Sequence, residues 1–177
     1  MGKISKTEIL TFAEAFVNSV GGTYTLISDD DDAFVHAHFA WTDEKGNLFV
    51  FFVRKFEAQK ENPTEDVNYR WIEFEDNKGE RGWARGSADF IVFEGADDWL
   101  IVRKKKLLKV IDDNMIDKSI VSDRSLWFRF YRGAHGKGRA VRVPLSLIRH
   151  NADRILIKRN FIEEVTGCTK SSVSKKV

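Results

Sequence analysis

Cysteine and proline are scarce in this sequence. Its 177 residues include one cysteine, Cys168, and two prolines. A lone cysteine excludes an internal disulfide and a cysteine-based zinc cluster, and it is typical of proteins from a reducing compartment. The low proline content, together with only 12 glycines, also excludes collagen-like and low-complexity chains.

Long hydrophobic runs are missing as well. No stretch approaches the roughly 20 apolar residues that span a bilayer, and the opening MGKISKTEIL lacks the apolar core of a signal peptide. We therefore expect a cytoplasmic protein with no membrane contact. The 42% of hydrophobic residues suffices for a core, so we expect a single domain over residues 1–166 and a flexible basic tail over 167–177.

Hydrophobic spacing predicts a helix at the start of the chain and many strands after it. Ser5 and Glu8 match a capping box, apolar residues follow at helical spacing up to Val20, and Gly21 ends the helix. Further helices are predicted over 103–111 and 144–148, and strands over 23–27, 34–41, 48–56, 69–75, 88–94, 99–102, 127–132 and 140–143. These elements predict an α/β (α+β) domain with one large, mixed and mainly antiparallel sheet flanked by helices.

The net charge of +2 hides an uneven distribution. From Arg124 onward there are thirteen Lys and Arg against three Asp and Glu, a net charge of +10, so the preceding residues carry −8. A basic C-terminal third, 124–166, indicates a surface for a polyanion such as nucleic acid, because each phosphate that a base neutralises releases counterions. Taken alone, the charge fits a solvated face equally well.

Several short phrases follow one another in an order that resembles a known family. Trp71-Ile72-Glu73-Phe74 precedes Arg81-Gly82-Trp83 and Ala88-Asp89-Phe90-Ile91-Val92-Phe93, and Gly136-Lys137-Gly138 later precedes Val143-Pro144. Over roughly residues 12–149 this order resembles the small phage and mobile-element proteins of the PD-(D/E)XK nuclease superfamily. The resemblance implies a restriction-endonuclease-like fold and, for a phage-encoded member, the cytoplasm of the host cell.

The resemblance also implies the site of a magnesium-dependent DNA endonuclease. Proteins of this family hold Mg²⁺ with two carboxylates on adjacent strands, and a lysine orients or activates the attacking water. Asp32 stands at the place of the first metal-binding acid and Lys55 at that of the lysine, and Glu73 is the first choice for a second carboxylate supplied from a shifted position, so these three are the candidate catalytic residues. Glu57 and Glu75 are alternative positions for a shifted carboxylate, and the acidic run that ends at Asp32 is also typical of an ordinary polar loop.

The predicted strand 48–56 departs from the family's Glu-x-Lys motif. If Lys55 is the family lysine, Val53 stands at the glutamate position, and if Arg54 replaces it, Phe52 stands there. Because an apolar side chain does not ligate a metal, we expect cleavage to be weak or lost. Asp89 and Lys104 imitate the same motif, again without its glutamate. His36 and His38 are interpreted as core or surface histidines, because no further ligand completes a metal site.

Bases and aromatic residues alternate along the predicted hairpin 127–143. Trp127 and Tyr131 lie between bases, a combination that suits neutralisation of a phosphate backbone and stacking on unpaired bases. The glycine-rich stretch 133–138 is expected to be the hairpin turn. The candidate nucleic-acid-binding residues are Arg129, Arg132, Lys137, Arg139 and Arg142. The lysines of 104–109 are expected to be a solvated helix face that contributes less to binding.

Two functions are therefore carried forward. The first is a nucleic-acid-binding protein of nuclease ancestry that acts on DNA, with weak or lost Mg²⁺-dependent cleavage. The second is a non-catalytic phage or mobile-element protein that binds and modulates another protein. Fold resemblance does not separate them, because function depends on the residues of the site.

Overall fold

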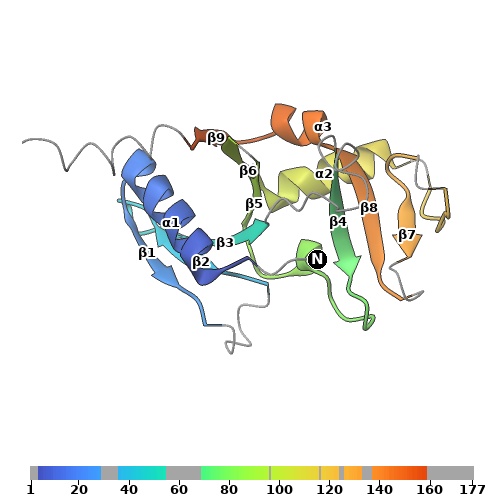
Figure 1. Cartoon of the computed structure of the whole chain (residues 1–177), viewed down its shortest axis with the longest axis horizontal. Coiled ribbons are helices and arrows are strands. Elements are labelled where there is room, and N and C mark those ends of the chain that lie inside the picture. Colours follow the sequence, from blue (N-terminus) through green and yellow to red (C-terminus); the bar gives the residue numbers. More distant parts are fainter. Residues whose placement is uncertain are drawn as a thin grey trace, which may run out of the picture.

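The structure, a computed structural model, describes residues 4–28, 36–54, 69–95, 97–115, 117–123, 126–132 and 137–158. Several positions that the sequence singled out lie outside these ranges: Asp32, Lys55, Glu57, most of the glycine-rich stretch 133–138 and the tail 167–177. The described strands form two sheets, with helices packed against them (Figure 1).

The larger sheet has six strands in the order β1-β2-β3-β5-β6-β9. All neighbours are antiparallel except β3 and β5, which are parallel with Phe51 opposite Phe90. Between β3 and β5 the chain leaves this sheet to form a strand of the other one. The bounds are β1 Thr23–Leu26, β2 Phe39–Thr42, β3 Leu48–Arg54, β5 Phe90–Glu94, β6 Asp98–Arg103 and β9 Arg154–Ile157.

The smaller sheet has three antiparallel strands in the order β4-β8-β7. Their bounds are β4 Tyr69–Glu75, β7 Phe130–Arg132 and β8 Arg139–Pro144. The α+β class and the mixed, mostly antiparallel pairing are thus confirmed, but the prediction of one sheet is wrong for the described strands. Side-chain alternation predicts a buried face for each strand without determining which strand lies beside it.

Three α-helices and one 3-10 turn complete the described elements: α1 Lys6–Val20, η3 Trp83–Arg85, α2 Lys104–Asn114 and α3 Leu145–His150. The predicted capping box of α1 is confirmed. The Ser5 hydroxyl accepts a hydrogen bond from the Glu8 N–H at 3.2 Å, and the Glu8 carboxylate accepts one from the Ser5 N–H at 2.8 Å. Gly21 ends the helix in the left-handed region, with φ of 80°.

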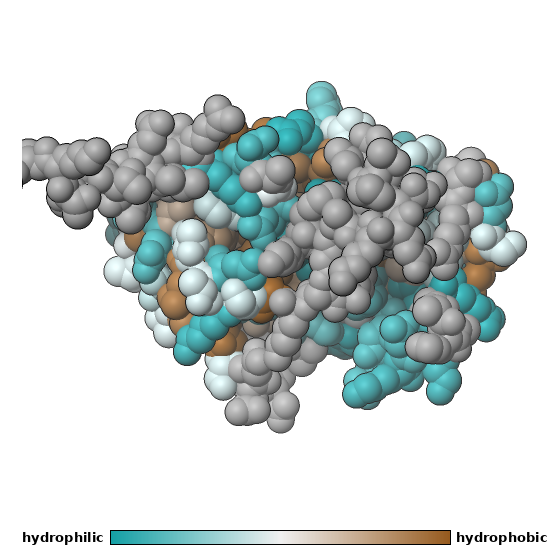
Figure 2. Space-filling model, viewed as in Figure 1, coloured by the Kyte–Doolittle hydropathy of each residue, from teal (hydrophilic) through white to brown (hydrophobic). Residues whose placement is uncertain are grey.

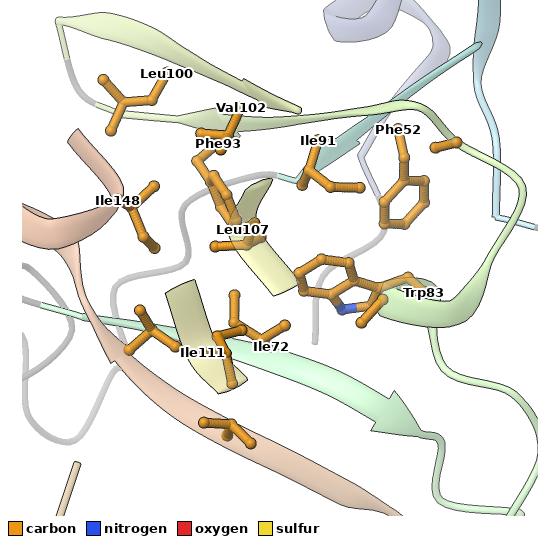
Figure 3. Close-up of a cluster of buried hydrophobic side chains, with 14 of the residues drawn as sticks. Phe52, Ile72, Trp83, Ile91, Phe93, Leu100, Val102, Leu107, Ile111 and Ile148 are labelled. Carbon is orange, nitrogen blue, oxygen red and sulfur yellow. The ribbon is translucent and has the colours of Figure 1, made fainter. Parts of the chain in front are cut away.

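Two hydrophobic cores lie on opposite faces of the six-stranded sheet. On one face, Phe12 and Phe16 of α1 pack against Phe39 and Phe51. The other core lies between the two sheets, and α2 and α3 complete it (Figure 3). Its members include Phe52, Ile91 and Phe93 of the larger sheet, Ile72 of β4, Trp83 of η3, Leu107 and Ile111 of α2, and Ile148 of α3.

Three local features differ from the sequence-based expectations. β2 begins at Phe39, and the preceding His36 has a φ of 54°, which is incompatible with a strand. β7 begins at Phe130 because Phe128 also has a positive φ, of 56°. β9 was not predicted. None of the described helices is both long and apolar enough to cross a membrane.

Candidate functional site

Glu73 is the predicted catalytic residue that falls within the described part of the chain. It lies on β4 and is half-buried. Burial raises the pKa of its carboxyl group above the ordinary value, and the positive charges of Arg54 and His36 oppose part of that rise. Arg54 and His36 are therefore the charged groups that most favour the ionised form of Glu73.

The alternation of β3 decides which of its residues point toward the smaller sheet, to which Glu73 belongs. Val53 is 1% exposed and belongs to the core beneath α1. Phe52 and Arg54 point to the opposite side, where the Arg54 guanidinium carbon lies 5.8 Å from the Phe52 ring centroid and 5.4 Å from that of Trp83. Because residues two apart share a face, the pair that faces β4 is Phe52 with Arg54.

Phe52, one of the two residues that the resemblance places at the glutamate position, lies among aromatic rings. Its ring centroid lies 4.7 Å from that of His38, and 5.9 Å from those of His36 and Trp83. Among the described residues, no three His, Cys, Asp or Glu side chains come close enough together to hold a metal ion. This part of the chain does not fit Mg²⁺, and the other predicted ligand, Asp32, lies outside it.

Both histidines near this site are hydrogen-bonded to the backbone. His38 Nδ1 accepts a hydrogen bond from the Val53 N–H at 3.1 Å, so the imidazole takes the place of a ladder carbonyl just before β2 begins. His36 Nε2 donates to the Arg81 carbonyl at 2.8 Å, which joins the start of β2 to the turn before η3. These contacts give both rings a structural role.

Asp89, in the phrase that suggested the family, joins three elements. Its carboxylate accepts a hydrogen bond from the Val50 N–H at 3.0 Å, and its carbonyl accepts one from the Lys104 N–H at 2.7 Å. Burial lowers the pKa of the Lys104 ammonium, and Asp89 opposes part of that change. Asp89 and Lys104, the second pair of residues that imitates the nuclease motif, therefore have a structural role. Their hydrogen bonds hold β3, the start of β5 and the start of α2 together.

The predicted nucleic-acid-binding residues come together around the β7–β8 hairpin, in which Arg132 lies opposite Arg139. Two of them have carboxylate partners that sequence reasoning missed. Arg129 pairs with Asp117, whose pKa falls to about 2 because Ser119 and Arg129 hydrogen-bond to the carboxylate. Arg139 lies 2.9 Å from Glu75 on β4. These pairs reduce the charge that the two arginines offer to a phosphate.

Arg142 lies among aromatic rings on the face of the three-stranded sheet opposite Ile72 and Val141. Its guanidinium carbon lies 3.9 Å from the Tyr69 ring centroid and 4.2 Å from that of Trp127. Trp71 and Tyr131 continue the group with a centroid distance of 5.0 Å. Trp127 is 39% exposed. We call these five residues, Tyr69, Trp71, Trp127, Tyr131 and Arg142, the aromatic face.

Arg132 and Lys137 are the exposed bases of the hairpin end. Gly138 closes the turn with a φ of 78°, and a side chain there would come within 2.6 Å of the Asp76 carbonyl. Glycine is therefore required both for the turn and for its close packing against the end of β4. In Figure 2, hydrophilic residues gather at the lower right, where Figure 1 places the ends of β4 and the β7–β8 hairpin.

No protein-family model, no curated protein and no solved structure matches this chain. Tyr69 and Trp71 are the site residues that sequence reasoning did not select. The alternation of β4, in which Ile72 is apolar and inward, places both rings on the opposite face, so this signal was present in the sequence. The carboxylate partners of Arg129 and Arg139 come from other elements and left no local signal.

Proposed function

We propose that this chain is a nucleic-acid-binding protein that acts on DNA through its three-stranded sheet. The observation that supports the proposal most is the aromatic face, where Arg142 lies against Tyr69 and the partly exposed Trp127. An exposed ring beside a cation suits stacking on an unpaired base. The exposed bases Arg132 and Lys137, at the end of the same hairpin, suit contacts with the phosphate backbone.

We further propose a restriction-endonuclease-like fold and nuclease ancestry. The chain order supports this: a first helix, α1, is followed by β1 and β2, by β3 at the place of the Glu-x-Lys strand, and by β4 with Glu73. The Gly82-Trp83 turn and β5 come next, as in the family order. Phe52 beside Arg54, and cations around Glu73, favour weak or lost cleavage.

The binding proposal is tested by fluorescence anisotropy with a labelled single-stranded oligonucleotide and with its duplex. We expect affinity to fall steeply with salt, and Arg132→Gln/Lys137→Gln to lower the log-log slope by up to about 1.4 for the single strand. Trp127→Ala should weaken single-strand binding about tenfold, since one stacked base contributes roughly 1–3 kcal/mol. Lys6→Gln/Lys45→Gln, which removes two charges from α1 and the β2–β3 turn, is the matched control.

Salt-independent binding, or no binding at low salt, would contradict the proposal. Cleavage is assayed separately on plasmid and single-stranded DNA with Mg²⁺ or Mn²⁺, and we expect it to be absent or weak. Any activity should disappear in Asp32→Ala and in Glu73→Ala while both variants stay folded. Vigorous cleavage that survives both substitutions would show that the site lies elsewhere.

The second hypothesis, a non-catalytic protein that binds and modulates another protein, has its own supporting observation. Ile120, Leu126 and Trp127 are each about 40% exposed, and the segment that carries them adjoins β7. Exposed apolar side chains that gather in one region are typical of protein interfaces. A failure of DNA binding, together with protection of these residues by a protein partner in hydrogen exchange, would favour this function.

A further inference from the structure

A row of cations leads from the hairpin across the turn at η3 to the start of α2. In the segment 81–86, Gly82, Trp83, Ala84 and Gly86 are buried, whereas Arg81 and Arg85 are exposed. Trp83 is 1% exposed and anchors the turn in the core between the sheets. The two arginines are therefore held at the surface by a buried turn.

Close packing fixes this turn against β4. A side chain at position 82 would come within 2.6 Å of the Glu73 carbonyl, so only glycine fits there. Residues 75 and 81 pair as an isolated antiparallel bridge. On the other side, the Lys104 ammonium donates a hydrogen bond to the Gly86 carbonyl at 2.5 Å, which ties the turn to the first residue of α2.

The charges along this row are only partly compensated. Arg81 has no carboxylate partner within the described part of the chain, and both Lys105 and Arg81 act against the charge on Lys104. Asp89, whose charge favours the ammonium form of Lys104, already accepts a hydrogen bond from the Val50 N–H. The separate turn that follows β4, with Asp76, Lys78 and Glu80, has a net charge of −1 and precedes the row in the chain.

Glu75 links the row to the hairpin. One oxygen of its carboxylate lies 2.9 Å from Arg139 and 3.9 Å from Arg85. A single negative charge is thus shared by two guanidinium groups, one from β8 and one from η3. The cations of the hairpin and those of the turn therefore form one continuous surface.

We propose that the phosphate backbone of the bound nucleic acid continues from the hairpin along Arg81, Arg85, Lys104 and Lys105. This inference rests on the proposed function and adds the path of the strand. It also revises the sequence-based view of the lysines at 104–109 as a solvated face. Lys104 and Lys105, at the start of α2, belong to the row, whereas Lys109 pairs with Asp113 one turn later.

The test is Arg81→Gln/Lys105→Gln, because both side chains are exposed and neither holds the turn in place. We expect the affinity for duplex DNA at 0.1 M salt to fall at least about fivefold, and the log-log salt slope to drop by about 1 to 2. Lys6→Gln/Lys45→Gln, with the same loss of charge, should leave both values unchanged. Thermal unfolding of each variant checks that the fold is retained.

The outcomes separate this inference from the function on which it rests. If the unmodified protein does not bind DNA at low salt, the proposed function fails. If Arg132→Gln/Lys137→Gln weakens binding but Arg81→Gln/Lys105→Gln does not, the hairpin is the interface and the path along the turn is wrong. An equal loss in the Lys6/Lys45 control, or equal competition by polyglutamate at matched charge, would also overturn the inference, the latter in favour of an acidic protein partner.

Discussion

The two sheets of this protein differ in how many of their faces are buried. The six-stranded sheet is covered on one face by α1, and on the other by α2, α3 and the smaller sheet. The three-stranded sheet shares only one face with a core, and its other face has Arg142 against Tyr69 and the partly exposed Trp127. A sheet buried on both faces serves as a scaffold, and for this reason the proposed nucleic-acid binding is assigned to the smaller sheet.

Aromatic residues are common on both sheets, but their exposure differs. At the centre of the larger sheet Phe51 stacks between Phe39 at 4.8 Å and Phe90 at 5.0 Å, and it is fully buried. On the smaller sheet the rings of Tyr69 and Trp127 lie against a guanidinium group. Cations also lie near rings of the larger sheet, where the Arg103 guanidinium carbon is 5.5 Å from the Phe90 ring centroid. The proposed binding surface therefore rests on the partial exposure of Trp127, and the number of aromatic residues does not distinguish the two sheets.

The largest expected effect comes from placing a charge inside the scaffold. Val53→Glu would bury a carboxylate without a partner among apolar side chains, so we expect the free energy of unfolding to fall by about 5 kcal/mol. Leu48→Glu on the same strand, at a position 56% exposed, should change it by no more than about 0.5 kcal/mol. Urea denaturation compares the two variants. A folded Val53→Glu protein of normal stability would show that β3 is not buried on both faces.

The next effect contrasts one aromatic residue from each sheet region. Phe12→Ala should lower the free energy of unfolding by about 3–5 kcal/mol, because it leaves a cavity beneath α1. Trp127→Ala should lower it by only about 1 kcal/mol, which is the loss of an exposed cation-π contact. Equal losses in urea unfolding would mean that the aromatic face belongs to a core and is not a ligand surface.

The smallest effect concerns Glu73. Its pKa is raised by burial, so the folded protein holds this proton more tightly than the unfolded chain does. That contribution to stability is present below the ordinary glutamate value of about 4.3 and is lost as the pH rises through the raised pKa. Glu73→Gln, which stays neutral, should therefore gain stability relative to the unmodified protein as the pH rises from 4 to 7.5.

Urea unfolding at several pH values measures this difference. Glu80→Gln, in the exposed turn after β4, is the control for removal of one acid. A loss of stability in Glu73→Gln that grows with pH would contradict the argument, because it would mean that Arg54 and His36 outweigh the effect of burial. Such a result would also mean that the folded protein favours the ionised form of Glu73, which is the form that a metal ligand requires.

Much of the local structure could be predicted from the sequence. The capping box fixed the start of α1, and the predicted strand 69–75 has the bounds of β4. The strands expected to begin at residues 34 and 127 begin later in the structure, because His36 and Phe128 adopt positive φ angles. No pattern in the sequence predicts these angles. The short edge strand β9 was missed because its three apolar residues, Ile155, Leu156 and Ile157, form a continuous run without the alternation that marks a strand.

The candidate site was predictable only in part. Whether Val53 or Phe52 points toward the smaller sheet depended on which face of β3 is covered by α1. The sequence contained no information on that contact. The charge on the hairpin was visible, but the pairing of Arg129 with Asp117 and of Arg139 with Glu75 was not. Both pairs join residues from separate elements, and their geometry depends on the packing of those elements.

The sequence by itself determined the helices, most of the strands, the apolar character of β3 and the basic C-terminal third. These features depend on neighbouring residues, so periodicity, capping and composition suffice to find them. Only the tertiary structure decided that there are two sheets, that Phe52 and Arg54 face β4, and that Arg81, Lys104 and Arg139 lie along one surface. Those relations join residues far apart in the chain, and they arise from burial of apolar faces that fit several strand arrangements until the whole chain packs.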